Sequence, residues 1–168
     1  MNEAIQAIQD RLDLMELIAR YGEGLDARDW VLWREVFTDS ALFDLSSWSG
    51  ATPQRVETDR VVRGQARIFA ELSVTQHLMS NFQITLQGDK ARVRAVMRAE
   101  HWLPLNDGTD NAKRYTMFGT YDDQALRING AWKIDEMHLN VTKTEGERWV
   151  MDEASRRSRA KYKANLNK

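Results

Sequence analysis

The start of the chain carries the hydrophobic periodicity of a helix. Apolar and small residues recur at steps of three and four positions, at Ile5, Ile8, Leu12, Met15, Ile18, Ala19, Gly22 and Leu25. This spacing is typical of an amphipathic helix with one buried stripe. Asp26 continues the stripe, because at about 3.6 residues per turn it lies in line with Ile8. The pattern leaves two interpretations of Asp26 open, a carboxylate that faces the core or an N-cap of the next helix.

The next part of the chain contains shorter predicted elements. A second short helix follows the first, with Asp29 or Asp26 as its N-cap. Its predicted apolar contacts are Trp30, Trp33 and Phe37. Residues 41–48 are predicted to form a strand, residues 49–63 a polar loop, and residues 64–72 a third short helix.

The second half of the chain changes to the period of a sheet. Strands are predicted over residues 75–87, 91–105, 113–127 and 132–143. Gly-Asp at 88–89 and Asn-Gly at 129–130 are typical of the tight turns of hairpins. The clearest alternation lies in residues 91–103, where odd positions are apolar except for His101 and most even positions are charged. One buried face and one solvated face indicate an antiparallel strand.

Helices followed by an antiparallel sheet indicate an α+β fold. The segment from residue 147 onward reads as a basic helix at the end of the chain. We therefore predict one α+β domain over residues 1–146 and a basic C-terminal helix or tail over residues 147–168.

Composition and charge exclude several classes of protein. The 168 residues suffice for one domain with a real core. The formal net charge of −1 argues against a nucleic-acid-binding module, and no apolar run reaches the roughly 20 residues of a membrane span. The absence of cysteine excludes disulfides and thiolate metal sites, and it is compatible with a cytoplasmic protein. The acidic N-terminus does not resemble a secretory leader.

A few polar side chains fall where they could carry chemistry. Tyr21 lies one turn before Asp26 on an adjoining face, where tyrosines commonly sit at the edge of a core. His77 begins a predicted strand, where a structural histidine is the commoner case. His101 shares the apolar face of its strand, so it is either a polar link in the core or a group in a pocket. The direction of His138 is undetermined, and we take it as structural.

A carboxylate beside an imidazole is the pair that proton abstraction next to a carbonyl would use. The histidine takes the proton, and the aspartate holds its tautomer. Tyrosine hydroxyls can hydrogen-bond the developing oxyanion. Two histidines and one carboxylate could instead form a non-haem iron site, but these groups lie on three separate elements and we predict no metal. The chain contains no phosphate-binding glycine loop, no G-x-S-x-G and no H-E-x-x-H.

Five short motifs, in order along the chain, resemble a known family. They are YGEGLDARDW (21–30), LFDLSSW (42–48), TQH-x3-N (75–81), His-Trp (101–102) and NGAWKI (129–134). Together they are similar to the SnoaL-like branch of the nuclear transport factor two-like superfamily, over roughly residues 5 to 145. Within that branch the nearest likeness is to scytalone dehydratase and its relatives, which include bile-acid dehydratase and hexachlorocyclohexane dehydrochlorinase.

The resemblance implies a cone-like barrel, in which a curved mixed or antiparallel sheet wraps around the long N-terminal helix and encloses a pocket without a cofactor. It maps the catalytic aspartate to Asp26 and the catalytic histidine to His77. His101 matches the second pocket histidine of the scytalone dehydratases, and Tyr21 matches the tyrosine five residues before the aspartate in the bile-acid dehydratases. Three positions depart from scytalone dehydratase, whose two pocket tyrosines and pocket asparagine are replaced here by Leu25, Leu45 and Tyr121. The departures imply a substrate other than scytalone.

These observations lead to one functional hypothesis with alternatives. The protein is expected to be a cofactor-independent lyase of the dehydratase type, with Asp26, His77, Tyr21 and His101 as catalytic residues. The substrate is expected to be a small, hydrophobic, cyclic, oxygenated molecule. Its expected contacts are Tyr115, Tyr121, Trp30, Phe43, Asn81 and Met97. The alternatives are an isomerase, a dehydrohalogenase, or a non-catalytic binder or partner subunit. The family likeness implies a homodimer or homotrimer, and we expect neither nucleic acid nor membrane as a partner.

Overall fold

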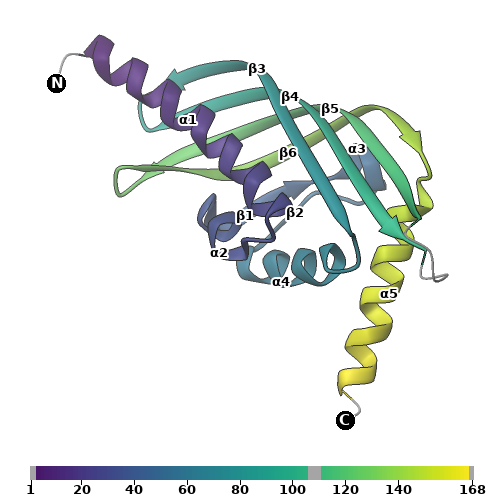
Figure 1. The fold of residues 1–168 in the computed structure, drawn as a ribbon. Coiled ribbons are helices and arrows are strands. Elements are labelled where there is room, and N and C mark those ends of the chain that lie inside the picture. The colour runs from purple at the N-terminus through teal and green to yellow at the C-terminus, as the bar shows by residue number, and fades with distance from the viewer. Residues whose placement is uncertain (1–2, 106–110, 167–168) are drawn as a thin grey trace.

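The fold combines five helices and six strands within the part of the chain that the structure describes, residues 3–105 and 111–166 of a computed structural model (Figure 1). The elements are α1 (Glu3–Asp26), α2 (Trp30–Glu35), β1 (Phe37–Asp44), α3 (Ser46–Ser49), β2 (Gln54–Glu57), α4 (Thr58–Phe69), β3 (Val74–Gln87), β4 (Lys90–Pro104), β5 (Ala112–Ile128), β6 (Ala131–Gly146) and α5 (Trp149–Leu166). Among these helices none is long and apolar enough to cross a membrane.

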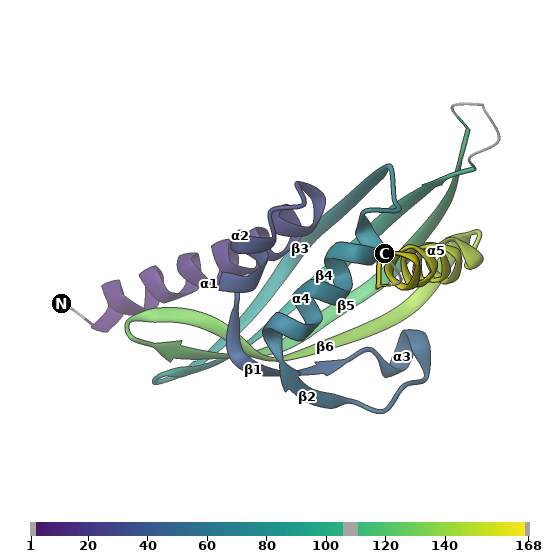
Figure 2. The ribbon, with the colours of Figure 1, turned by 90° about the horizontal axis from the view of Figure 1, so that it is seen from below.

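One mixed sheet holds all the described strands in the order β2-β1-β6-β5-β4-β3. β1 runs parallel to β6, and every other neighbouring pair is antiparallel. The long strands curve around the helices, α1 crosses the sheet obliquely, and α5 projects away from the body (Figures 1 and 2). The predicted α+β fold is therefore confirmed, with its long N-terminal helix, curved mixed sheet and C-terminal helix.

The four long strands were predicted to within a few residues at each end. Their turns follow from residues that adopt a positive φ, at Gly88 (62°), Asn129 (51°) and Gly130 (83°). Two consecutive positive φ angles at Asn-Gly match the right-handed twist of the strands that the turn joins. In β4 the odd-numbered residues from Ala91 to Leu103 are at most 2% exposed, so this strand forms one layer of the core, as its alternation indicated.

The strand predicted over residues 41–48 is wrong at both ends. β1 begins at Phe37 and stops at Asp44, and the last residues of the predicted strand form the short helix α3. The chain turns because the Asp44 carboxylate accepts hydrogen bonds from the backbone N–H of Ser46 at 2.9 Å and from its hydroxyl at 2.6 Å. A side chain that binds the backbone two residues ahead competes with continued strand pairing.

The loop predicted over residues 49–63 is also wrong in part. It contains β2, which pairs with β1, and the start of α4 at Thr58. The Thr58 hydroxyl is buried and donates to the Thr38 carbonyl at 2.6 Å. This contact joins positions 20 residues apart, so local composition did not indicate it.

The buried stripe predicted for α1 holds only at Ile18, Gly22 and Leu25, and Ala19 is exposed. The four apolar residues that precede Ile18 in the predicted stripe are 39–61% exposed, namely Ile5, Ile8, Leu12 and Met15. The helix instead buries Asp10, whose carboxylate accepts two hydrogen bonds from the Arg127 guanidinium at 2.8 and 2.7 Å. The ion pair turns this face of α1 toward the β5–β6 hairpin and leaves the predicted face in solvent.

Candidate active site

A cavity of about 350 Å³ opens between the C-terminal half of α1 and the sheet. Its lining is predominantly apolar and comes from nearly every element. The residues are Tyr21, Leu25, Trp33, Phe43, Leu45, Trp48, Ser49, Ala51, Thr52, Gln54, Val56, Val61, Gln65, Phe69, His77, His101, Met117, Tyr121, Met137, Leu139 and Met151. Of the described residues, no lysine, arginine, aspartate or glutamate lines it. A volume of this size suits a small organic molecule.

An aspartate–histidine pair forms part of one wall of this cavity. The His77 Nδ1 atom lies 2.7 Å from Asp26 Oδ1, and the His77 backbone N–H donates to Asp26 Oδ2 at 2.6 Å. The His77 side chain is 3% exposed and lines the cavity, whereas Asp26 lies behind it and is 23% exposed. An ionised carboxylate only accepts hydrogen bonds, so the proton between the two groups belongs to Nδ1, and in a neutral imidazole Nε2 then keeps its lone pair.

The end of α1 places the Asp26 carboxylate. The helix stops at Asp26, and Arg28 takes a left-handed conformation with φ of 59°. Asp29, not Asp26, caps α2, because its carboxylate accepts from the Leu32 N–H at 2.9 Å. The interpretation of Asp26 as an N-cap is therefore wrong, and its carboxylate turns toward β3.

His77 is placed by β3 and by a small residue on α1. A Cβ atom on Gly22 would lie 3.3 Å from the His77 carbonyl oxygen, so glycine lets the helix and the strand approach closely. The imidazole stacks on Phe69 with ring centroids 6.3 Å apart, and His101 meets it edge-on at 5.4 Å. These contacts fix the plane of the ring.

The carboxyl group of Asp26 is held in its ionised form. Burial would raise the pKa of Asp26, but hydrogen bonds from the His77 ring, the His77 backbone and the Thr75 hydroxyl outweigh burial. The pKa is therefore lower than the usual 3.8. Asp26 is therefore ionised at neutral pH and can accept the hydrogen bond that orients the imidazole.

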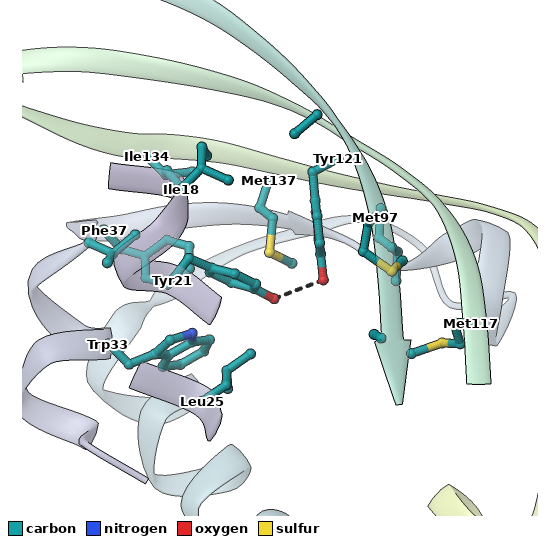
Figure 3. Packing of buried hydrophobic residues seen from close by; sticks show 14 of the residues in the cluster. Ile18, Tyr21, Leu25, Trp33, Phe37, Met97, Met117, Tyr121, Ile134 and Met137 are labelled. Atoms are coloured by element: carbon teal, nitrogen blue, oxygen red, sulfur yellow. Dashed lines mark hydrogen bonds between the residues drawn. The ribbon is translucent and has the colours of Figure 1, made fainter. Parts of the chain in front are cut away.

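Two tyrosine hydroxyls meet inside the same cavity. Tyr21 Oη and Tyr121 Oη lie 3.0 Å apart, and both rings are buried (Figure 3). Burial raises the pKa of both hydroxyls, so both stay protonated at neutral pH. One hydroxyl donates to the other, which leaves one O–H free to donate to a bound molecule.

His101 completes the polar part of the wall. Its side chain is 1% exposed, and its Nδ1 atom has no partner among the described residues. Burial, assisted by the neighbouring His77, lowers the pKa of His101 to about 3. It is therefore neutral at physiological pH and can exchange a hydrogen bond with a ligand without carrying charge.

The structure brings Tyr21, His77, His101, Tyr121 and Phe43 to the cavity, as expected for site residues. Four predicted contacts do not line it, namely Trp30, Asn81, Met97 and Tyr115. Trp30 packs on Trp33 and Phe69, and Met97 lies in the core layer of β4. Tyr115 is buried and accepts a hydrogen bond from Trp48 Nε1 at 3.2 Å.

Asn81 is displaced from the cavity by a bulge. It has a positive φ of 52°, and the pairing of β3 with β4 shifts register between Ser80 and Gln83. The side chain of Asn81 is exposed, although simple alternation along β3 would place it on the same face as His77.

Several lining residues were not anticipated from the sequence. Met117, Met137 and Met151 come from β5, β6 and α5, and Phe69 comes from the end of α4. The inward parity of Met117 was visible on its strand, but nothing local showed that α5 would deliver Met151. Among the described residues, no cluster of three or more histidine, aspartate or glutamate side chains has the geometry of a metal site.

A second histidine–aspartate pair lies outside the cavity. His138 Nδ1 lies 3.2 Å from Asp44 Oδ2, and the His138 side chain is 30% exposed. Neither residue lines the cavity. This pair therefore provides an internal control for the pair formed by Asp26 and His77.

The fold and the site together define a cone-shaped α+β protein that encloses one apolar, small-molecule-sized cavity beside an aspartate–histidine pair. The family description "SnoaL-like domain" matches residues 6–138. The chain belongs to this family, as the sequence motifs indicated.

Several known proteins are similar to this chain over most of its length. Rv2910c, an uncharacterized protein of Mycobacterium tuberculosis, is 23% identical over 131 residues, which cover 78% of this chain and 84% of that protein. The crystal structure of Kfla4162 from Kribbella flavida is 29% identical with a TM-score of 0.81, covering 87% of this chain and 99% of that one.

Two further structures carry names that refer to chemistry. A protein of Novosphingobium aromaticivorans DSM 12444, provisionally named scytalone dehydratase, is 19% identical with a TM-score of 0.73 and covers 86% of this chain and 91% of that one. A hexachlorocyclohexane dehydrochlorinase, LinA type 2, is 13% identical with a TM-score of 0.71 and covers 86% and 93%. At these identities the likeness shows the shared fold.

Proposed function

We propose that this protein is a cofactor-independent lyase of the dehydratase type. The observation that carries the proposal is the 2.7 Å contact between His77 Nδ1 and Asp26 Oδ1 at the wall of an apolar cavity. A neutral imidazole held in this way presents Nε2 as a base on the side away from the carboxylate.

The proposed step removes a proton from the carbon next to a carbonyl. His77 Nε2 takes that proton, and the C–H electrons form an enolate whose oxygen carries the charge. The Asp26 carboxylate stabilises the imidazolium that results. The enolate then expels a hydroxyl group from the next carbon, and the imidazolium returns its proton to that leaving group. One C–H bond and one C–O bond break, a C=C bond forms, and water leaves.

The tyrosine pair and His101 would stabilise the oxygen that becomes charged. The pair Tyr21 and Tyr121 has one O–H free to donate, and His101 Nδ1 has no partner within the described chain. Their protonated or neutral states at pH 7 suit hydrogen bonding better than full proton transfer.

The lining favours a neutral, hydrophobic, oxygenated substrate. A charged group would be desolvated in a wall that offers it no opposite charge among the described lining residues. Trp33, Phe43 and Phe69 provide aromatic surface for a cyclic body, while Gln54 and Gln65 offer amide groups to an uncharged polar substituent.

Neutral cyclic β-hydroxy ketones such as 3-hydroxy-1-tetralone test the proposal in heavy water by NMR. We expect wild-type protein to catalyse dehydration and exchange of the α-proton for deuterium. His77→Ala is expected to reduce both rates by about 10²- to 10⁴-fold. The matched control His138→Ala, in the second histidine–aspartate pair, is expected to leave them unchanged. Equal rates in wild type and His77→Ala would overturn the proposal.

Two neighbouring reactions use the same proton abstraction. An isomerase would return the proton to another carbon, and a dehydrohalogenase would expel halide in place of hydroxide. The similarity of the fold to a hexachlorocyclohexane dehydrochlorinase favours including halogenated cyclic compounds in the screen. A protein that binds these ligands without exchange or elimination would instead be a small-molecule binder.

We also propose that the protein associates with a second copy of itself. Four large apolar side chains of α1 are exposed in one row, Ile5, Ile8, Leu12 and Met15. Met15 shares a groove with Leu78 and Phe82 of the edge strand β3, so the apolar surface continues onto the sheet. A second copy carries the same row and can pair apolar with apolar surface. Light scattering after size exclusion is expected to show a dimer or trimer; a monomer at high micromolar concentration would refute this.

A further inference from the structure

Two polar residues beside the aspartate–histidine pair have no part in the proposed chemistry. Thr75 lies two residues before His77 on β3 and is 7% exposed. Arg28 lies two residues after Asp26, beyond the end of α1. Neither lines the cavity. Their contacts nevertheless converge on Asp26.

The hydrogen bonds among these residues have only one consistent direction. Arg28 Nη1 lies 2.6 Å from Thr75 Oγ1, and Thr75 Oγ1 lies 2.9 Å from Asp26 Oδ1. A guanidinium only donates, so the Thr75 hydroxyl accepts from Arg28 and must give its single hydrogen to Asp26. The hydroxyl thus joins a cation to the carboxylate without breaking the contact between Asp26 and His77.

The backbone of Arg28 has an unfavourable conformation, which the contacts of its side chain hold in place. A φ of 59° is unfavourable for a residue with a Cβ atom, and glycine usually occupies such a position after a helix. The side chain compensates by donating to the carbonyl oxygens of Leu25 at 2.6 Å and Leu72 at 3.4 Å. Strained residues that several partners hold in place cluster at functional sites.

Arg28 also contacts the aromatic ring that stacks on the imidazole. Its guanidinium lies 5.3 Å from the centroid of the Phe69 ring, which stacks on His77 with an interplanar angle of 20°. One residue therefore supports both the carboxylate that binds Nδ1 and the ring that fixes the imidazole plane.

We propose that Arg28 and Thr75 are positioning residues that orient the Asp26 carboxylate and thereby keep His77 in the tautomer with the proton on Nδ1. The proposal rests on the proposed function, in which Nε2 of His77 is the base. It goes further because it states that two residues outside the cavity determine the tautomer of that base.

Arg28 is joined to the Asp26 carboxylate through the Thr75 hydroxyl, and this indirect connection has a chemical consequence. A guanidinium paired directly with the carboxylate would compete with His77 for the Asp26 oxygens, because such pairs are bidentate and strong. Arg28 contacts the main-chain oxygen of Asp26, at 3.3 Å, while Thr75 and His77 contact the carboxylate. All three donors that meet the carboxylate come from β3.

Substitution of Thr75 separates the hydroxyl from the shape of the side chain. Thr75→Val removes the donor at nearly constant volume, and Thr75→Ser restores it. We expect Thr75→Val to reduce kcat by roughly 10- to 100-fold, the value of one hydrogen bond to a charged group, with KM within about twofold. Thr75→Ser is expected to recover most of the loss. Thr85→Val, on the exposed part of β3, is the control.

Substitution of Arg28 separates the guanidinium from the backbone shape. Arg28→Gly relieves the strain and deletes the cation, so a purely structural role predicts unchanged or higher stability and unchanged activity. We expect stability to be kept and kcat to fall roughly tenfold. Asn129→Gly, at a φ of 51° in the remote β5–β6 turn, is the control for the backbone effect.

The tautomer of His77 is the measurement that decides, since it does not depend on turnover. Nitrogen-15 NMR of the imidazole is expected to show Nδ1–H alone in the wild type, and a mixture with Nε2–H in Thr75→Val and Arg28→Gly. A single Nδ1–H tautomer in both variants would overturn the proposal. If no substrate turns over in the wild type, the proposed function fails while the tautomer measurement still decides whether these residues position Asp26.

Discussion

Replacing Asp26 by asparagine tests the link between the carboxylate and the base. Asp26 accepts three hydrogen bonds, from the Thr75 hydroxyl, the His77 ring and the His77 backbone. Asparagine offers one oxygen and one NH₂ group, so it cannot accept at both positions. If the NH₂ takes the Oδ1 position, His77 must move its proton to Nε2 and loses its function as a base. If the NH₂ group takes the Oδ2 position, it faces the His77 backbone N–H, and the contact between these two donors costs about 1–3 kcal/mol.

The loss of charge adds to the loss of geometry. In the proposed step His77 becomes an imidazolium whose Nδ1 lies 2.7 Å from a carboxylate oxygen. At an effective dielectric constant of about 20, unit charges roughly 4 Å apart attract by about 4 kcal/mol. Since each 1.4 kcal/mol is about tenfold in rate, we expect kcat for Asp26→Asn to fall roughly a thousandfold.

The assay measures turnover of a cyclic β-hydroxy ketone by Asp26→Asn and by a control variant, and thermal unfolding checks that both variants are folded. Asp44→Asn is the matched control, because Asp44 also contacts a histidine but lies outside the cavity. It is expected to stay within about twofold of the wild type. A folded Asp26→Asn variant that turns over within about tenfold of the wild type would refute the role assigned to the carboxylate.

Three further perturbations test other parts of the structure. Burial raises the pKa of Asp123 well above its usual value. The Asp123 carboxyl therefore contributes fully to stability at a pH below its pKa in the unfolded chain, which is about 3.9. That contribution is lost as the pH rises through its higher pKa in the folded protein. Asp123→Asn should therefore raise the free energy of unfolding in urea at pH 7, by about 1.4 kcal/mol for each pKa unit of elevation, and flatten its dependence above pH 4; an unchanged pH slope would contradict this. Gly119→Ala would place a Cβ atom 2.0 Å from the Asn140 carbonyl oxygen and should cost about 3 kcal/mol, whereas Gly64→Ala, with open space on α4, should be neutral or stabilising by up to about 1 kcal/mol. Tyr121→Phe removes one hydroxyl of the tyrosine pair and should reduce kcat about a hundredfold with little change in KM, and a rate equal to that of the wild type would exclude the pair from oxyanion binding.

The strands of the second half were predictable because their signals are local. Alternation in β4 separates Arg92 and Arg94 from Val93 and Ala95, and the Asn-Gly turn at 129–130 fixes where β5 ends and β6 begins. Both signals span only a few residues. The sheet's curvature and the parallel pairing of β1 with β6 have no local signal. The family resemblance implied the curvature, and it left open whether the sheet is mixed or antiparallel.

The orientation of α1 could not be read from its period. The helix carries a second apolar row through Leu14, Leu17 and Tyr21, next to the predicted row that begins at Ile5. The choice between the two rows is made by the ion pair of Asp10 with Arg127, which joins positions 117 residues apart. The buried face of α1 is the one that carries the charged residue Asp10, whereas the hydrophobic pattern alone predicts burial of the face that is exposed.

The candidate site also has one part that the sequence predicted and another that it did not. Asp26 and His77 were found through the family motifs, and the structure places them in contact. The lining was harder to predict because it depends on register. The bulge at Asn81 changes the parity of β3, and the pairing of β5 with β6 shifts between Phe118 and Gly119.

Three residues that break local rules lie around His77. Asp26 ends an apolar stripe with a charge, Arg28 occupies a backbone conformation suited to glycine, and His101 buries an imidazole nitrogen without a partner among the described residues. Each of these features costs stability by itself. Sequences that specify a fold are locally consistent, so concentrated exceptions are expected where function and not folding has selected the residue. Their convergence on His77 is an argument for the site that depends on neither the family likeness nor the cavity.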